Sequence, residues 1–244
     1  MYPKNLSVSH FIRYMCVPTF CYQHSYPSTD QIRPFYLLKR VLEGFLLLLF
    51  TSYLMSQHAM KIAETSLPYF MEWNTRKIIE KTLHMAVPAA YIWLGNFYLI
   101  FHTYLNFWAE LTMFADRRFY SDWWNSSNLG EYWQKWNMPI HNFLLRHIYL
   151  PLRRLGISSS YCLLATFTFS AFFHEYVVVG IFSVVNGIAF TLMMVCVPVI
   201  AVQRAFKNRI SGNTNNILFW LGYLVIGQPF GILYIHYQIH YQKH

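Results

Sequence analysis

Two ionisable residues, His174 and Glu175, stand in the middle of the apolar stretch FTFSAFFHEYVVVGIF, residues 167–182. A charged side chain in the hydrocarbon core costs at least ~2.5–3.5 kcal/mol on insertion scales, so such residues usually face a protein interior or an aqueous cavity. A neutral histidine there can remove a proton from an attacking hydroxyl group, typically for ~10²–10⁴-fold in rate. We expect burial to keep the imidazole neutral at physiological pH. The pair therefore predicts proton-transfer chemistry.

Glu175 follows His174 by one residue, which is about 100° around a helix, so the two side chains cannot point at the same spot. We expect Glu175 to hydrogen-bond within the helix bundle, through a neighbouring span, and to tune the site. The structural alternative for His174 is a packed core histidine paired with another helix. Four further histidines carry no motif, and we interpret them as interfacial or packed residues: His84, His102, His236 and His240.

The composition indicates that a membrane positions this pair. Hydrophobic residues make up 55% of the 244 and charged residues 12%, about half the charged share of a soluble domain. A soluble bundle would need polar outer faces, and the apolar segments have too few polar residues to supply them. Asn186-Gly187 favours a turn between two of these segments. We expect an all-α, multispanning membrane protein with five spans, at 36–57, 84–106, 160–184, 187–203 and 216–236.

The basic residues predict how the chain is oriented. Of the 19 lysine and arginine residues, 14 fall in the N-terminal segment, in a middle loop over 110–155 and in 204–215. Five spans would place these three segments on the same side of the membrane. The positive-inside tendency assigns that side to the cytosol and the C-terminal His244 to the lumen. The net charge of +9 has the same cause, together with contact with anionic headgroups, so we expect no nucleic-acid partner. Residues 1–9 contain no apolar run, so we expect the first span to act as the membrane signal.

The cysteines predict no metal site. The four, Cys16, Cys21, Cys162 and Cys196, form no CxxC pair, and two of them lie in expected spans. Neither a disulfide framework nor a zinc site is indicated.

The middle loop, 110–155, mixes four tryptophans with charges of both signs. Indole rings suit the headgroup level, and apolar residues recur at helical spacing from Pro139 onward, which predicts a short interfacial amphipathic helix. The loop can therefore be an interfacial anchor. Its interleaved polar residues can equally form a site for a ligand that is part charged and part apolar: Asp122, Asn125, Asn137, His141 and Arg146.

Three motifs carry a resemblance to a known family. FYSDWWN at 119–125, SAFFHEY around His174 and IGQP at 226–229 resemble the acyl-CoA:diacylglycerol acyltransferase branch of the membrane-bound O-acyltransferases. The sterol O-acyltransferase branch shares FYxDWWN and HEY, but SAFFHEY, IGQP and the pattern HxxLxRHxYxP at 141–151 favour the diacylglycerol branch. The resemblance begins at Tyr2 and covers nearly the whole chain. Enzymes of this type are about twice as long, so 1–244 resembles one membrane-embedded domain, the C-terminal half of the family fold.

The resemblance implies roles for particular residues. It makes His174 the catalytic residue, and it places Gln228 of IGQP on the wall of the reaction chamber. It places Met193 and Glu175 among the substrate-binding residues, and Cys196 in MMVCVP stands where this branch usually carries a chamber glutamine. It assigns the acyl-CoA site to the residues of FYSDWWN, Phe119, Tyr120, Asp122, Trp123, Trp124 and Asn125.

The resemblance implies a reaction in which an acyl group passes from acyl-CoA to the hydroxyl of diacylglycerol in the endoplasmic reticulum membrane. Asn125 and Gln228 are the candidates for donors to the developing oxyanion, because amides donate hydrogen bonds without a charge. The expected partners are acyl-CoA, the lipid alcohol and membrane lipids, with no cofactor, and a homo-oligomer stays open. Three alternatives remain: a sterol or other lipid alcohol as acceptor, an inactive acyl-CoA-binding protein, and a proton-coupled carrier.

Overall fold

The protein is almost entirely helical. The computed structural model describes residues 7–206 and 211–243. Helices hold 80% of these residues, and the only β pairing among them is a bridge between Ser28 and Phe114. The helices, with η marking π- or 3₁₀-helical turns, are α1 Val8–Cys16, α2 Pro34–Leu54, η1 Met55–Ala59, α3 Met60–Met71, α4 Thr75–Phe97, η2 Tyr98–Tyr104, α5 Leu105–Leu111, η3 Trp123–Asn125, α6 Leu129–Trp136, α7 Met138–Leu144, η4 Leu145–Tyr149, α8 Leu150–Arg154, α9 Ser159–Phe182, α10 Ile188–Ala205, α11 Gly212–Trp220, η5 Leu221–Gly227 and α12 Gln228–Lys243.

Some expectations fall on residues 1–6, 207–210 and 244, outside the described part of the chain. They are the beginning of the family resemblance at Tyr2, the basic residues Lys207 and Arg209, and the lumenal placement of His244. Most of the segment without an apolar run, 1–9, lies there too.

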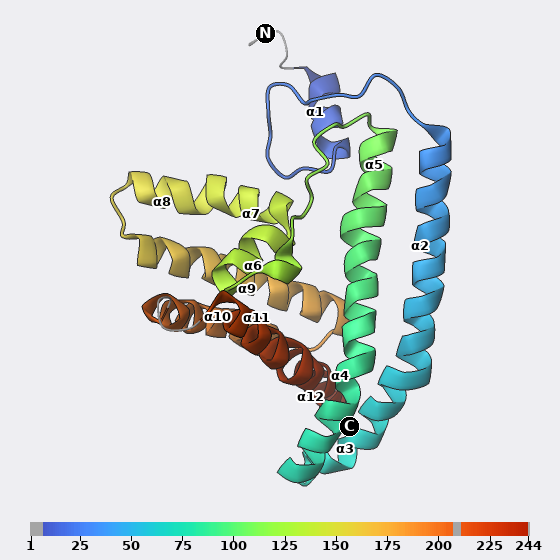
Figure 1. Cartoon of the computed structure of the whole chain (residues 1–244), viewed down its shortest axis with the longest axis vertical. Helices are drawn as coiled ribbons and strands as arrows, with labels where there is room; N and C mark the ends of the chain where they lie inside the picture. Colours follow the sequence, from blue (N-terminus) through green and yellow to red (C-terminus); the bar gives the residue numbers. More distant parts are fainter. Residues whose placement is uncertain (1–6, 207–210, 244) are drawn as a thin grey trace.

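A long helical hairpin forms one side of the molecule. Helices α2 and α3 run in one direction, and α4 to α5 return beside them (Figure 1). Pro34 opens α2, where its fixed φ suits the first helical position. Asn74 caps α4 by accepting from the backbone N–H of Lys77. The returning segment, Thr75–Leu111, has 37 residues, or about 55 Å of helix.

Glu110, whose side chain is fully buried, closes the open end of this hairpin. Its carboxylate accepts from the backbone N–H of Arg33 at 2.8 Å and from Nε and Nη2 of the same arginine at 3.0 and 2.8 Å. Arg117 Nη1 lies 2.6 Å from the same carboxylate. A buried charge needs partners of this kind, since an isolated one would be strongly disfavoured. The start of α2 is therefore fastened to the end of α5 and to the loop that follows.

Four helical segments among the described residues are long and apolar enough to cross a membrane, namely Thr75–Leu111, Ser159–Phe182, Ile188–Ala205 and Gly212–Tyr241. They coincide with or contain four of the five expected spans. The first expected span, 36–57, is helical but is not among the four, so its crossing of the membrane stays a prediction. Charges at Lys39, Arg40 and Glu43, and polar residues from Ser52 to His58, shorten its apolar stretch. It still packs antiparallel along α4 and α5.

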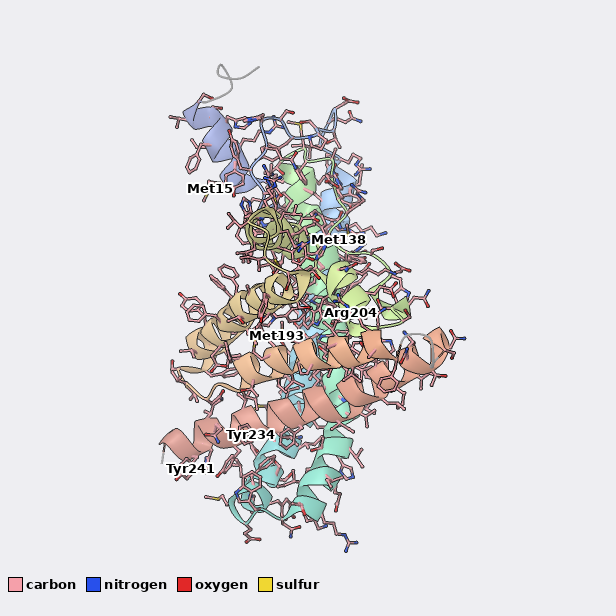
Figure 2. The ribbon with its side chains drawn as sticks, turned by 90° about the vertical axis from the view of Figure 1, so that its left-hand side faces the viewer. Met15, Met138, Met193, Arg204, Tyr234 and Tyr241 are labelled. Atoms are coloured by element: carbon pink, nitrogen blue, oxygen red, sulfur yellow. The ribbon has the colours of Figure 1, made fainter. Side chains whose placement is uncertain are left out.

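The remaining long helices cross the hairpin. Figure 1 shows α9, α10 and α11–α12 on one side of the hairpin and steeply inclined to it, and α12 contacts α3 and α4. Figure 2 shows Met193 and Arg204 on α10 above Tyr234 and Tyr241 on α12. Between α9 and α10 the chain turns through Ser183 and Gly187, both with positive φ. The break expected at Asn186-Gly187 is confirmed.

The middle loop folds into short helices that pack on the spans. Asn128 caps α6 and Asn137 caps α7, each by accepting from a backbone N–H three residues later. The helix expected from Pro139 is present as α7, η4 and α8. Trp123 is only 4% exposed, whereas Trp124 is 54% exposed. The anchor interpretation is therefore wrong for Trp123, which packs in the main core with Tyr132, and the loop forms part of the helical body.

Candidate active site

His174 lies on α9, in its C-terminal half, and its imidazole is exposed at the surface of the described chain. Its Nδ1 lies 2.8 Å from the backbone carbonyl oxygen of Ser170. A carbonyl oxygen only accepts, so the geometry assigns the proton to Nδ1 and leaves the lone pair of Nε2 free. Within the described residues the side chain faces outward, so the expected burial of the imidazole stays a prediction. Its orientation comes from the helix backbone instead.

Glu175 points toward the start of α10. Its Oε1 accepts from the backbone N–H groups of Asn186 at 3.3 Å and Gly187 at 2.8 Å, and its Oε2 accepts from that of Phe190 at 3.2 Å. The expected hydrogen bonding to a neighbouring span is therefore confirmed. Its role as a substrate-binding residue stays a prediction.

Trp133, on α6, is the residue of the middle loop that reaches His174. The ring centroids of Trp133 and His174 are 6.4 Å apart at 85°, and those of Trp133 and Phe167 are 6.3 Å apart at 87°. The indole Nε1 is buried, and Trp133 also reaches the thiol of Cys196 on α10. Sequence reasoning missed this residue because no motif contains it. Its helical spacing with Trp136 indicates a packed face of α6, but not which helix that face meets.

Trp123 is the centre of an aromatic cluster between the middle loop and the spans. Its ring centroid lies 4.9 Å from that of Phe97, 5.2 Å from that of Trp93, 5.3 Å from that of Trp136 and 5.6 Å from that of Trp220. Aromatic pairs at these separations contribute beyond simple burial. The motif FYSDWWN is thus fixed against α4 and α11 by its first tryptophan.

The other aromatic residues of the motif have separate environments. Phe119 is 2% exposed and packs with the N-terminal segment and α5. The Tyr120 hydroxyl lies 2.8 Å from Nδ1 of His102, a histidine that carried no motif. Burial raises the pKa of Tyr120. Trp124 presents its ring to the surface, and its backbone carbonyl accepts from Asn216 and Trp220 of α11, each at 3.2 Å.

Asp122 makes an ion pair that braces the motif against α6. Lys135 Nζ lies 3.0 Å from Asp122 Oδ1 and 2.7 Å from Glu131 Oε1. The hydrogen bond from Lys135 is the main cause that lowers the pKa of Asp122. Ser121 also donates its backbone N–H to the carbonyl of Lys135 at 2.9 Å. Asp122 therefore has a partner within the protein, Lys135, and its contact with a ligand stays a prediction.

Asn125 and Gln228 are not joined to His174 by any hydrogen bond found among the described residues. Asn125 ends η3 with an exposed side chain. Gln228 begins α12, and its Oε1 is buried without a hydrogen-bond partner. Met193 is 6% exposed and belongs to the same hydrophobic cluster as Trp123 and Phe167. The structure therefore groups Met193 with the loop and α9, while the roles of the two amides stay predictions.

Comparison with known proteins agrees with the motifs. The model of the membrane-bound O-acyltransferase family matches residues 2–236. The chain is 40% identical over 248 residues to diacylglycerol O-acyltransferase 1 of Homo sapiens, covering 99% of this chain and 49% of the relative. It is 40% identical over 237 residues to the Bos taurus protein of that name, and the match covers 96% of this chain and 47% of the relative. It is 38% identical over 233 residues to the Dictyostelium discoideum protein of that name, and the match covers 96% of this chain and 37% of the relative.

The chain thus spans about half the length, or less, of these relatives. The family match nevertheless takes in every motif described above, from the N-terminal segment to IGQP. The fold agrees with it, since the chain is helical and has several segments that can span a membrane. The chain belongs to the membrane-bound O-acyltransferase family.

Proposed function

We propose that this chain carries the catalytic histidine of an acyltransferase that moves an acyl group from acyl-CoA to the free hydroxyl of diacylglycerol, giving triacylglycerol. The single observation that carries the mechanism is the hydrogen bond from His174 Nδ1 to the Ser170 carbonyl, which leaves Nε2 as an outward-facing base. The relatives named diacylglycerol O-acyltransferase 1 support the choice of acceptor.

The chemistry requires one proton to move twice. Nε2 of His174 takes the hydroxyl proton as the alcohol oxygen attacks the thioester carbon. A tetrahedral oxyanion forms and then collapses, breaking the carbon–sulfur bond. The departing sulfur takes the proton from the imidazolium, so the products are an ester and CoA thiol. No cofactor is required, because acyl-CoA enters as a substrate.

The oxyanion needs donors, and Asn125 and Gln228 remain the proposed ones. The family resemblance, and not a contact with His174, is what brings the two amides to this role. His174 also lies on an outward face of a spanning helix, where direct contact with lipid would be unfavourable. We infer that further membrane helices, outside these 244 residues, cover this face in the active form and complete the chamber.

The proposed setting is the endoplasmic reticulum membrane, with the middle loop cytosolic and the C-terminus lumenal. Three of the membrane-spanning segments follow the middle loop, so the loop and the C-terminus fall on opposite sides whether or not α2 crosses. Acyl-CoA then approaches the basic cytosolic face, and the lipid alcohol approaches from within the bilayer. Self-association stays open in this proposal.

One assay tests the proposal. Purified protein is supplied with labelled oleoyl-CoA and a panel of acceptors: diacylglycerol, a sterol, a wax alcohol and retinol. Transfer mainly to diacylglycerol supports the proposal, and transfer mainly to another alcohol changes the acceptor. The exposure of His174 favours a second candidate, an inactive protein that binds acyl-CoA. Binding without transfer, even beside the matching half of a full-length relative, would identify that candidate.

A further inference from the structure

We propose that Glu175 is a positioning residue: its carboxylate caps the N-terminus of α10, and through that contact it holds α9, and with it His174, in register with α10. On this proposal Glu175 is neither a proton partner of His174 nor a substrate ligand. The inference rests on the proposed function only for its catalytic consequence, since the contact itself is independent of any reaction.

The start of α10 lacks a cap of its own. The N-cap position is Gly187, which has φ +68° and no side chain. The first N–H groups of a helix have no partner within the helix. Asn186 satisfies one of them, since its Oδ1 accepts from Ile188 N–H at 2.9 Å. Glu175 satisfies those of Gly187 and Phe190 from across the turn, at 2.8 and 3.2 Å.

A carboxylate is well suited to this position. A helix N-terminus carries a partial positive charge, so a negative group there is stabilising. The two oxygens of Glu175 accept three backbone N–H groups together, including that of Asn186. An amide in the same place would offer one accepting oxygen and would turn an NH₂ donor toward other donors. Within a bilayer, the released N–H groups would find little water to replace the lost partner.

The geometry also separates Glu175 from the proton chemistry. In a Ser-His-Asp triad the carboxylate accepts the Nδ1–H of the histidine and fixes its tautomer. Here the Ser170 carbonyl oxygen takes that hydrogen bond at 2.8 Å. The Glu175 carboxylate is committed to the start of α10 on both of its oxygens. Its influence on His174 therefore passes through the backbone of α9 that the two residues share.

The primary test is hydrogen exchange of the backbone amides in 186–190, measured by mass spectrometry on the protein in nanodiscs. Glu175→Gln should speed exchange there by between about 2-fold and 30-fold, the range expected for loss of a helix cap. Glu72→Gln is the matched control, because Glu72 is exposed at the end of α3. Unchanged exchange in Glu175→Gln would overturn the proposal. This measurement needs no catalysis, so it fails independently of the proposed function.

A second-site variant distinguishes a cap from a substrate ligand. A Cβ at Gly187 would meet no heavy atom within 4 Å, and Asp is among the residues that tolerate positive φ. Gly187→Asp in the Glu175→Gln background should therefore return a carboxylate to the start of α10 and slow the exchange again. If the double variant exchanges as fast as Glu175→Gln alone, a carboxylate at the start of α10 does not restore the cap and the proposal fails.

Activity provides the last readout, in a form of the protein that is active. Glu175→Gln should lower kcat without shifting the pH–rate profile, and Gly187→Asp should restore part of the loss. A shifted profile would instead show that Glu175 takes part in proton transfer and would overturn the proposal. If the Glu175→Gln variant fails to insert into the membrane, Glu175→Asp can be used instead. It keeps the charge on a shorter side chain, so its amide exchange over 186–190 should be faster than that of the wild type but slower than that expected for Glu175→Gln. Wild-type exchange in that variant together with lost activity would also contradict the cap.

Discussion

Lys135 Nζ lies 3.0 Å from Asp122 Oδ1, and this ion pair joins FYSDWWN to α6, the helix that carries Trp133 to the candidate base. Lys135→Gln should loosen the motif and raise the KM for acyl-CoA. The melting temperature should fall by only about 2 °C, since partly exposed ion pairs contribute little. Lys39→Gln, at an exposed pair on α2, is the control for loss of charge, and an equal rise in KM there would contradict the bracing role.

The same ion pair predicts an acid sensitivity. Because Lys135 lowers the pKa of Asp122, the contribution of this carboxylate to stability is present at neutral pH and is lost as the pH falls through the lowered pKa, below about pH 4. Thermal melts of wild type and Lys135→Gln from pH 7 down to pH 3 measure this. The difference between the two should shrink at the acid end; a difference that grows would have the wrong sign.

His174→Ala should abolish acyl transfer, at a cost of ~10²–10⁴-fold or more in rate. Its side chain is exposed, so the free energy of unfolding should change by no more than about 0.5 kcal/mol. Expression, membrane insertion and acyl-CoA binding should stay largely intact, because the base acts on the acceptor hydroxyl. His84→Ala, at another exposed histidine on a span, is the control. Near-normal turnover without His174 would refute the mechanism.

Asn125 and Asn128 offer a comparison of two nearby amides. Asn125 is exposed and Asn128 caps α6. Asn125→Ala should lower kcat/KM for acyl-CoA with an unchanged melting temperature, whereas Asn128→Ala should cost about 0.5–2 kcal/mol of stability. Thermal melts and acyl-CoA titrations on both variants separate the effects. If Asn125→Ala leaves acyl-CoA use unaltered, the residue has no part in the site.

The basic residues predict topology. A C-terminal tag should be protected from protease in sealed microsomes, and a tag inserted near Gly156, in the exposed turn between α8 and α9, should be digested. Both tags should be digested once detergent opens the vesicles, which is the control for intact cleavage sites. Digestion of the C-terminal tag in sealed vesicles would reverse the orientation.

The isolated chain should show weak acyl transfer or none, because its candidate base faces outward and is left uncovered by the described residues. Co-expression with the matching half of a full-length relative should restore transfer if that half completes the chamber. The His174→Ala chain beside the same half serves as the negative control. Strong turnover by the 244 residues alone would show that the outward face needs no cover.

The sequence was sufficient to predict the helices and turns, but not which face of each helix turns toward the rest of the protein. Gly187 and Asn186 predict the turn between α9 and α10, because few other residues tolerate such a backbone. Apolar residues surround α9 on every side, so no pattern indicates which face turns inward, and the exposure of His174 could not be predicted. The contact with Trp133 also could not, since it depends on how α6 docks on α9.

The first expected span shows a different limit. Lys39, Arg40 and Glu43 make it too polar to count among the four apolar segments, yet α2 packs along α4 and α5. Its charges are tolerated because they pair within the helix, where Arg40 lies 3.0 Å and Lys39 lies 3.9 Å from the carboxylate of Glu43. Such pairs can be predicted from the sequence, whereas the docking of α2 on the returning helix depends on tertiary contacts.

The ion pair between Arg33 and Glu110 can form only in a certain order of events during synthesis. The two residues are 77 positions apart, so at ~5–20 residues per second the ribosome makes the arginine about 4–15 s before its carboxylate partner. During that interval α2 enters the insertion machinery with its N-terminal end unfastened. The hairpin can be locked only after α5 has emerged, and the middle loop that bears FYSDWWN begins to dock from that moment.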